Sequence, residues 1–117
     1  MNPQLFYGPC RVTSRTVAVG LGTLTSIAPY DPSRVVLIIG VSGVNAVQVA
    51  PRKTVTSTSG LTLGVNGQPY LQLDFSTVGP LVGVEWFANA AAATVVEVIE
   101  VFRDVDPERR LGGPPEV

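Results

Sequence analysis

The sequence contains no histidine among its 117 residues. This absence excludes Ser-His-Asp and Cys-His catalytic arrangements and the histidine metal sites of cupins and zinc enzymes. Cys10 is the single cysteine, so no intrachain disulfide can form. Without a histidine to activate its thiol, we expect Cys10 to be a small apolar side chain rather than a nucleophile. We therefore expect a protein that is not an enzyme and that holds no metal and no cofactor.

Charged residues are scarce as well. They make up 15% of the chain, whereas ordinary soluble domains contain about 25%. The net charge is −1 and the eight basic residues are dispersed, so the basic stripe of a nucleic-acid-binding protein is missing and we expect no nucleic-acid partner. A small monomer with so few charges would tend to associate through its exposed faces. We therefore expect a homo-oligomer or a component of a larger assembly.

Long hydrophobic runs are also absent. The most apolar stretches, residues 35–41 and 90–96, are far shorter than the roughly 20 residues that cross a bilayer. The first residues, Met1 to Leu5, lack the basic and apolar regions of a signal peptide. The sequence therefore predicts no membrane partner and no secretion signal.

The chain is rich in patterns that are typical of short β-strands. Residues 34–39 are apolar on both faces, as in a covered central strand. Residues 46–50 alternate, and we expect these two segments to form a hairpin. Alternation also places Leu71, Leu73 and Phe75 inward, and Trp86 is expected in the core. The predicted strands are 11–19, 24–27, 34–39, 46–50, 61–63, 70–75, 82–87 and 94–102.

Turn signals separate these strands. Asn66-Gly67 is a tight-turn dipeptide, and Ala88–Ala93 is expected to be a loop with at most one helical turn. Eight or so short strands with such spacing predict an all-β fold, a small β-sandwich or jelly-roll-like barrel. We expect this domain over residues 11–103, with an extended N-terminal arm at 1–10 and a flexible C-terminal tail at 104–117.

Several charged residues are candidates for functional groups. Arg34 is expected to cap a turn or to pair with Asp31. A hydrolase that uses Asp74 and Glu85 as a carboxylate pair is the least favoured function. The remaining acids gather toward the C-terminus and are interpreted as a solvated strand end and tail rather than a calcium site; they are Glu97, Glu100, Asp104, Asp106, Glu108 and Glu116.

The order of the segments over residues 34–101 resembles that in small virion proteins of tailed bacteriophages. In those proteins an R-x-x-L-x-I strand and a V-x-V hairpin lead to a G-x-x-L turn and then to a final hairpin. The matching segments here are SRVVLII at 33–39, VNAVQV at 44–49, SGLTL at 59–63, LQL at 71–73, VEWFA at 84–88 and AAATVVEV at 91–98.

The resemblance implies a small β-sandwich or jelly roll that is often trimeric. It implies a structural virion protein, foremost a capsid decoration (head-stabilising) protein that binds the head lattice as a homotrimer. The expected partners are then further copies of the chain and the major capsid or other virion proteins, and the expected location is the virion. A neck, tail or fibre-base structural protein is one alternative, and a carbohydrate- or receptor-binding module is another.

Position in the chain and polarity are the grounds on which we expect certain residues to contact partners. They lie in the two terminal segments and in the polar loop at residues 51–60. They are Leu5, Phe6, Tyr7, Arg52, Lys53, Arg109, Arg110 and Leu111.

Overall fold

The computed structural model describes residues 9–64 and 69–103. The predicted tail, most of the predicted N-terminal arm and the Asn66-Gly67 turn lie outside these residues. The described chain forms eight strands, one short helix and one 3-10 turn. They are β1 (Cys10–Val19), β2 (Thr25–Ala28), β3 (Arg34–Val41), β4 (Val47–Ala50), β5 (Leu61–Leu63), β6 (Tyr70–Asp74), α2 (Phe75–Val78), η1 (Gly79–Gly83), β7 (Trp86–Asn89) and β8 (Thr94–Arg103).

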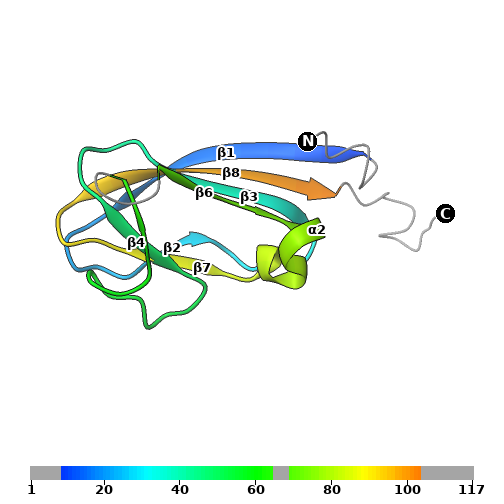
Figure 1. Ribbon diagram of the computed structural model, residues 1–117. Coiled ribbons are helices and arrows are strands. Elements are labelled where there is room, and N and C mark those ends of the chain that lie inside the picture. The colour runs from blue at the N-terminus through cyan, green and yellow to red at the C-terminus, as the bar shows by residue number, and fades with distance from the viewer. Residues whose placement is uncertain (1–8, 65–68, 104–117) are drawn as a thin grey trace.

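The strands form two antiparallel four-stranded sheets that pack face to face (Figure 1). One sheet, here the long sheet, has the order β1-β8-β3-β6, and the other has the order β2-β7-β4-β5. The first strand thus pairs with the last, the second with the seventh, the third with the sixth and the fourth with the fifth. This is the pairing of a rolled-up long hairpin, the jelly roll. The predicted all-β sandwich is confirmed.

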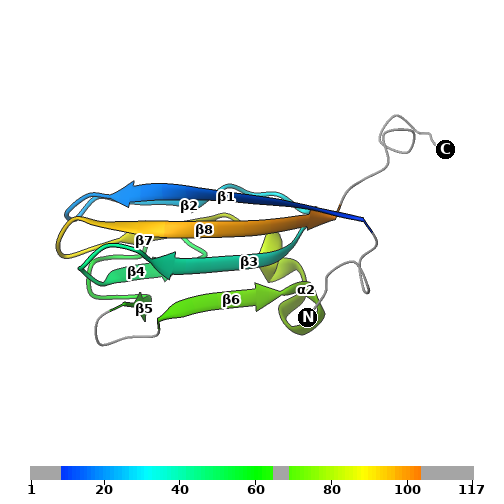
Figure 2. The same cartoon turned by 90° about the horizontal axis from the view of Figure 1, so that it is seen from above.

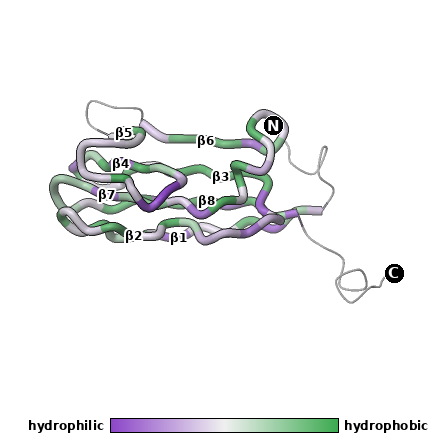
Figure 3. Tube along the Cα trace, turned by 90° about the horizontal axis from the view of Figure 1, so that it is seen from below, coloured by the Kyte–Doolittle hydropathy of each residue, from purple (hydrophilic) through white to green (hydrophobic). Residues whose placement is uncertain are grey.

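The core lies between the two sheets, where apolar side chains from both inner faces meet. Leu37 and Ile39 of β3 and Val96 and Val98 of β8 are fully buried there. Figure 3 shows β3, a central strand of the long sheet, as a largely hydrophobic segment. Trp86 belongs to the same cluster, which confirms its predicted place in the core.

The predicted hairpin between residues 34–39 and 46–50 is wrong. β3 pairs with β6 and β8 in the long sheet, whereas β4 pairs with β5 and β7 in the other sheet. The connection between β3 and β4 therefore crosses from one layer to the other. Sequence alternation specifies which residues of a strand face inward, but it carries no information about the pairing partner.

Several predicted strand ends shift by one or two residues, and at two strands a helical segment overrides the alternation. Asp74 ends β6 and caps α2, since its carboxylate accepts a hydrogen bond from the backbone N–H of Ser76. Phe75 therefore enters the helix and is exposed instead of facing inward. The strand predicted at 82–87 begins only at Trp86, because η1 occupies Gly79–Gly83.

The loop predicted at 88–93 is shorter than expected, because Ala88 and Asn89 belong to β7 and only residues 90–93 lie between β7 and β8. β7 ends at Asn89, and no helical turn follows before β8 begins at Thr94. Ala90 instead forms an isolated bridge with Leu21.

Candidate interaction surface

Arg34 and Glu100 form a buried ion pair at one end of the sandwich. The side chains are 0% and 2% exposed, and Arg34 Nη1 lies 2.6 Å from Glu100 Oε2. Arg34 also donates to three carbonyls: Nε to Val82 at 2.7 Å, Nη1 to Pro29 at 2.9 Å and Nη2 to Val84 at 2.7 Å. These bonds tie β3 to the chain between β2 and β3 and to the η1–β7 segment.

Arg15 of β1 binds the second oxygen of the same carboxylate. Its Nη2 also donates to the Ile27 carbonyl of β2 at 2.5 Å. Arg15 thereby connects the edge strands of the two sheets. Because both oxygens of Glu100 are engaged by guanidinium groups, this carboxylate stabilises the fold and is poorly placed to act as a general base.

The prediction that Glu100 belongs to a solvated strand end is wrong. Of the two roles expected for Arg34, the contact with the turn holds, since Nη1 donates to the Pro29 carbonyl, whereas the side chain pairs with Glu100 instead of Asp31. Asp31 instead accepts hydrogen bonds from the backbone N–H and the hydroxyl of Ser33. The sequence did carry a signal for Glu100, because Val96, Val98 and Glu100 occupy alternate positions of one strand and hence share its inner face.

The carboxylates considered for catalysis have separate structural partners. Asp74 caps α2, whereas Glu85 accepts a hydrogen bond from the Ser26 hydroxyl of β2 at 2.6 Å. Within residues 9–64 and 69–103, no three Cys, Asp or Glu side chains are grouped so that they could hold a metal ion. In that same part of the chain, no helix is long and apolar enough to cross a membrane.

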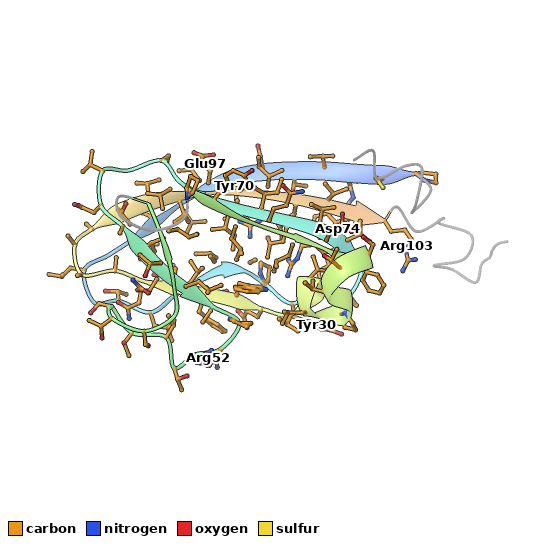
Figure 4. All side chains as sticks on the ribbon, in the orientation of Figure 1. Tyr30, Arg52, Tyr70, Asp74, Glu97 and Arg103 are labelled. Carbon is orange, nitrogen blue, oxygen red and sulfur yellow. The ribbon has the colours of Figure 1, made fainter. Side chains whose placement is uncertain are left out.

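Exposed apolar side chains gather around a pocket at the α2 end of the sandwich. The pocket has a volume of about 330 Å³ and is lined by Tyr30, Pro32, Phe75, Pro80 and Arg103, among others. Tyr30 is 67% exposed and Phe75 is 40% exposed. Figure 4 places Tyr30 and Arg103 at this end of the molecule. We call the exposed side chains of Tyr30 and Phe75 the end patch.

The opposite end also exposes apolar side chains. Leu21 and Leu24 lie between β1 and β2, and Val44 lies between β3 and β4. Along one side of the molecule β1 forms the edge of the long sheet over ten residues. Within the described chain, the outer edge of β1 has no partner strand. Such an edge is a template for pairing with another chain.

Two of the predicted contact residues lie in the described part of the chain. Arg52 and Lys53 are exposed on the loop between β4 and β5, and Figure 4 shows Arg52 on the side away from the long sheet. Arg52 borders another pocket with Leu61, Leu81 and Trp86. The other predicted contacts lie outside the described residues; they are Leu5, Phe6, Tyr7, Arg109, Arg110 and Leu111.

The end patch was not found from the sequence. Tyr30 lies in a turn between two prolines, and Phe75 was placed inward by alternation. The usable signal was Asp74 immediately before Phe75, since aspartate is one of the preferred residues at the start of a helix.

A comparison with known protein families finds no matching family model, and a comparison with curated proteins finds no significant match.

Proposed function

We propose that this chain is a structural virion protein that decorates and stabilises a capsid as a homotrimer. The observation that carries the proposal is the jelly-roll pairing of the eight strands, an architecture used by viral capsid domains. The resemblance of the strand order to that of small phage virion proteins points to the same function. A fold alone does not specify a function, so the surface must supply the rest of the argument.

The surface favours association with other proteins. Nine large apolar side chains are exposed in the described chain, and several of them gather at the two ends of the sandwich. The inner space is filled by the core and by the Arg15–Glu100–Arg34 network, so the function must reside on the outside. Surfaces of this kind become covered in oligomers and larger assemblies.

The mechanism of a decoration protein is mechanical. A subunit that binds only the mature lattice stabilises that state by mass action. Three linked copies that bind around a local threefold axis of the lattice have a much higher overall affinity than a single weak contact provides. The end patch is the contact that we propose for the capsid.

Co-sedimentation with capsids of the virus that encodes the chain tests this proposal. We expect the wild type to sediment with mature capsids and the Tyr30→Ser/Phe75→Ser variant to bind at least about tenfold more weakly, because it loses apolar contact area. Tyr70→Ser is the matched control, since Tyr70 is an exposed aromatic on the long sheet, away from the end patch. Absence of wild-type binding to any capsid form would contradict a decoration role. Binding to the neck, tail or fibre alone would instead show that the protein is a structural component of that part of the virion.

The pocket supports a second candidate, a carbohydrate- or receptor-binding module. Jelly rolls also occur in lectins, and an exposed aromatic residue such as Tyr30 beside a pocket of about 330 Å³ suits a ring-shaped ligand. A glycan array decides between the two candidates. Saturable binding that Tyr30→Ser abolishes would favour the module, whereas no binding at high protein concentration would count against it.

A further inference from the structure

The pocket at the α2 end of the sandwich brings together residues that are far apart in the sequence. Among its lining residues, Tyr30 precedes β3, Phe75 begins α2 and Arg103 ends β8. In Figure 2, β8 ends on the same side of the molecule as α2. The fold therefore places two aromatic rings and one arginine around the same space.

Arg103 gives this pocket a positive charge. Its side chain is exposed, and neither of the two ion pairs within the described chain involves it. The other arginine of the lining, Arg34, is neutralised by Glu100, and none of the described lining residues is acidic. Asp31 lies in the turn beside the pocket, but its carboxylate accepts hydrogen bonds from the backbone N–H and the hydroxyl of Ser33. The pocket is thus suited to an anionic group.

The remainder of the wall is mainly apolar. The rings of Tyr30 and Phe75 are joined there by Pro32 and Pro80. An apolar cavity of about 150 Å³ is enough to bind benzene. The pocket has a volume of about 330 Å³, so it can hold an aromatic ring together with a short substituent.

Hydrogen bonds and close packing fix the wall in place. The buried Arg34 side chain donates to the carbonyls of Val82 and Val84, which both line the pocket. The backbone N–H of Asp31 donates to the Gly83 carbonyl at 2.9 Å. A Cβ at Gly83 would lie 2.8 Å from the Asp31 carbonyl oxygen, so these two segments pack closely. A site that is already ordered loses little conformational entropy when a ligand binds.

We propose that this pocket binds an aromatic ring that carries a carboxylate, with the ring against Tyr30 and Phe75 and the carboxylate on Arg103. Aromatic rings pack favourably on one another, and a guanidinium group binds a carboxylate through two parallel hydrogen bonds. The source of this ligand follows from the proposed function, on which this inference rests. It is an acidic, aromatic segment of the protein that the end patch contacts.

A titration with two small probes tests the ligand class without a capsid. The probes are phenylpropionate, which has a ring and a carboxylate, and phenylpropionamide, which has nearly the same shape and no charge. Chemical-shift changes of the backbone amides measure both affinities in the full wild-type chain. We expect phenylpropionate to bind at least about threefold more tightly than the amide, with the largest changes at Phe75 and Gly83.

Single substitutions separate the contribution of the rings from that of the charge. Arg103→Gln should abolish the preference for the carboxylate and leave the affinity for phenylpropionamide unchanged, whereas Arg103→Lys should keep most of the preference. Tyr30→Ser should weaken the binding of both probes. Lys53→Gln is the matched control and should behave as the wild type, because Lys53 is an exposed cation on the loop between β4 and β5. The same spectra show whether each variant is folded.

Co-sedimentation with capsids connects the pocket to the proposed partner. Arg103→Glu should bind at least about tenfold more weakly than the wild type, and added salt should weaken the binding of the wild type. Lys53→Glu changes the net charge by the same amount and should bind as the wild type does. Equal losses for the two charge reversals would attribute the effect to net charge and overturn the proposal.

The two experiments fail in different ways. Equal affinity of the wild type for both probes, or a preference that survives Arg103→Gln, would overturn the ligand class. Capsid binding that requires Tyr30 and Phe75 but is unchanged by Arg103→Glu would overturn the acidic segment and keep the proposed function. A carboxylate preference in a chain that binds no capsid would instead refute the proposed function and support the ligand class.

Discussion

At the scale of single residues, the most consequential feature is the charge inside the sandwich. Arg34 and Glu100 are both buried and make several hydrogen bonds to each other and to backbone carbonyls. A buried ion pair contributes little net stability compared with a well-packed apolar pair. Loss of one partner is costly, however, because the remaining charge stays buried without compensation.

Glu100→Gln should therefore destabilise the fold by about 3–5 kcal/mol, since Arg34 keeps its charge and loses its counter-ion. Urea unfolding followed by Trp86 fluorescence measures the change. Glu97→Gln is the matched control on the same strand. Glu97 is exposed and accepts a hydrogen bond from the Thr16 hydroxyl, so its substitution should change the free energy of unfolding very little. Equal effects of the two substitutions would contradict the role assigned to the network.

Replacing both partners should be milder than replacing one. In Arg34→Met/Glu100→Leu no buried charge of the pair remains, and similar side-chain volumes are kept. We expect the double variant to be more stable than Glu100→Gln by about 1–3 kcal/mol in the same unfolding experiment. A double variant that is less stable than Glu100→Gln would show that the hydrogen bonds of Arg34 to the carbonyls contribute more to stability than the charge balance.

The burial of Glu100 was accessible from its strand position, but its partners were not. Arg34 is 66 positions away in the sequence, and nothing local indicates that β3 and β8 are neighbours. The end patch was missed for a related reason. The alternating pattern of β6 predicts that Phe75 faces inward, but Asp74 caps α2 and places Phe75 in the helix, where it is exposed.

At the scale of elements, strand positions followed from local patterns, whereas pairing did not. The alternation of Leu71 and Leu73 and the apolar run of β3 were sufficient to locate these strands. The false β3–β4 hairpin shows the limit, because the side-chain pattern of a strand is the same whichever sheet it joins. Only the rolled arrangement of the whole chain decides the partner.

The loop between β4 and β5 depends on a glycine for its shape. Gly60 has a positive φ of 121°, and a Cβ there would lie 2.9 Å from both the Val49 carbonyl oxygen and Val55 Cγ2. Gly60→Ala should therefore destabilise the protein by about 1–3 kcal/mol, measured by thermal or urea unfolding.

Gly40→Ala is the matched control for this prediction. Gly40 lies within β3, and an added Cβ would meet Tyr70 Cβ at an ordinary 3.7 Å. We expect no loss of stability there, because alanine also restricts the unfolded chain. If Gly60→Ala were as stable as Gly40→Ala, the loop would have a different conformation from the one described.

At the scale of the whole molecule, the scarcity of charge and the exposed apolar ends have the same implication. A chain with 15% charged residues and apolar side chains around both ends of its sandwich is suited to contact with other subunits. The general all-β architecture could be predicted from the sequence, because regularly spaced short strands leave few other solutions. The identity of the exposed apolar side chains could not be predicted, because their exposure depends on which loops and helix caps meet at the ends of the sandwich.

We propose that this chain is a subunit of a symmetric assembly. Multi-angle light scattering during size-exclusion chromatography, over a wide range of protein concentration, measures the mass of the particle. We expect a stable particle with about three times the 12.3 kDa mass of one chain. A monomer that persists at high concentration would contradict it, and would favour a binding module that acts as a single domain.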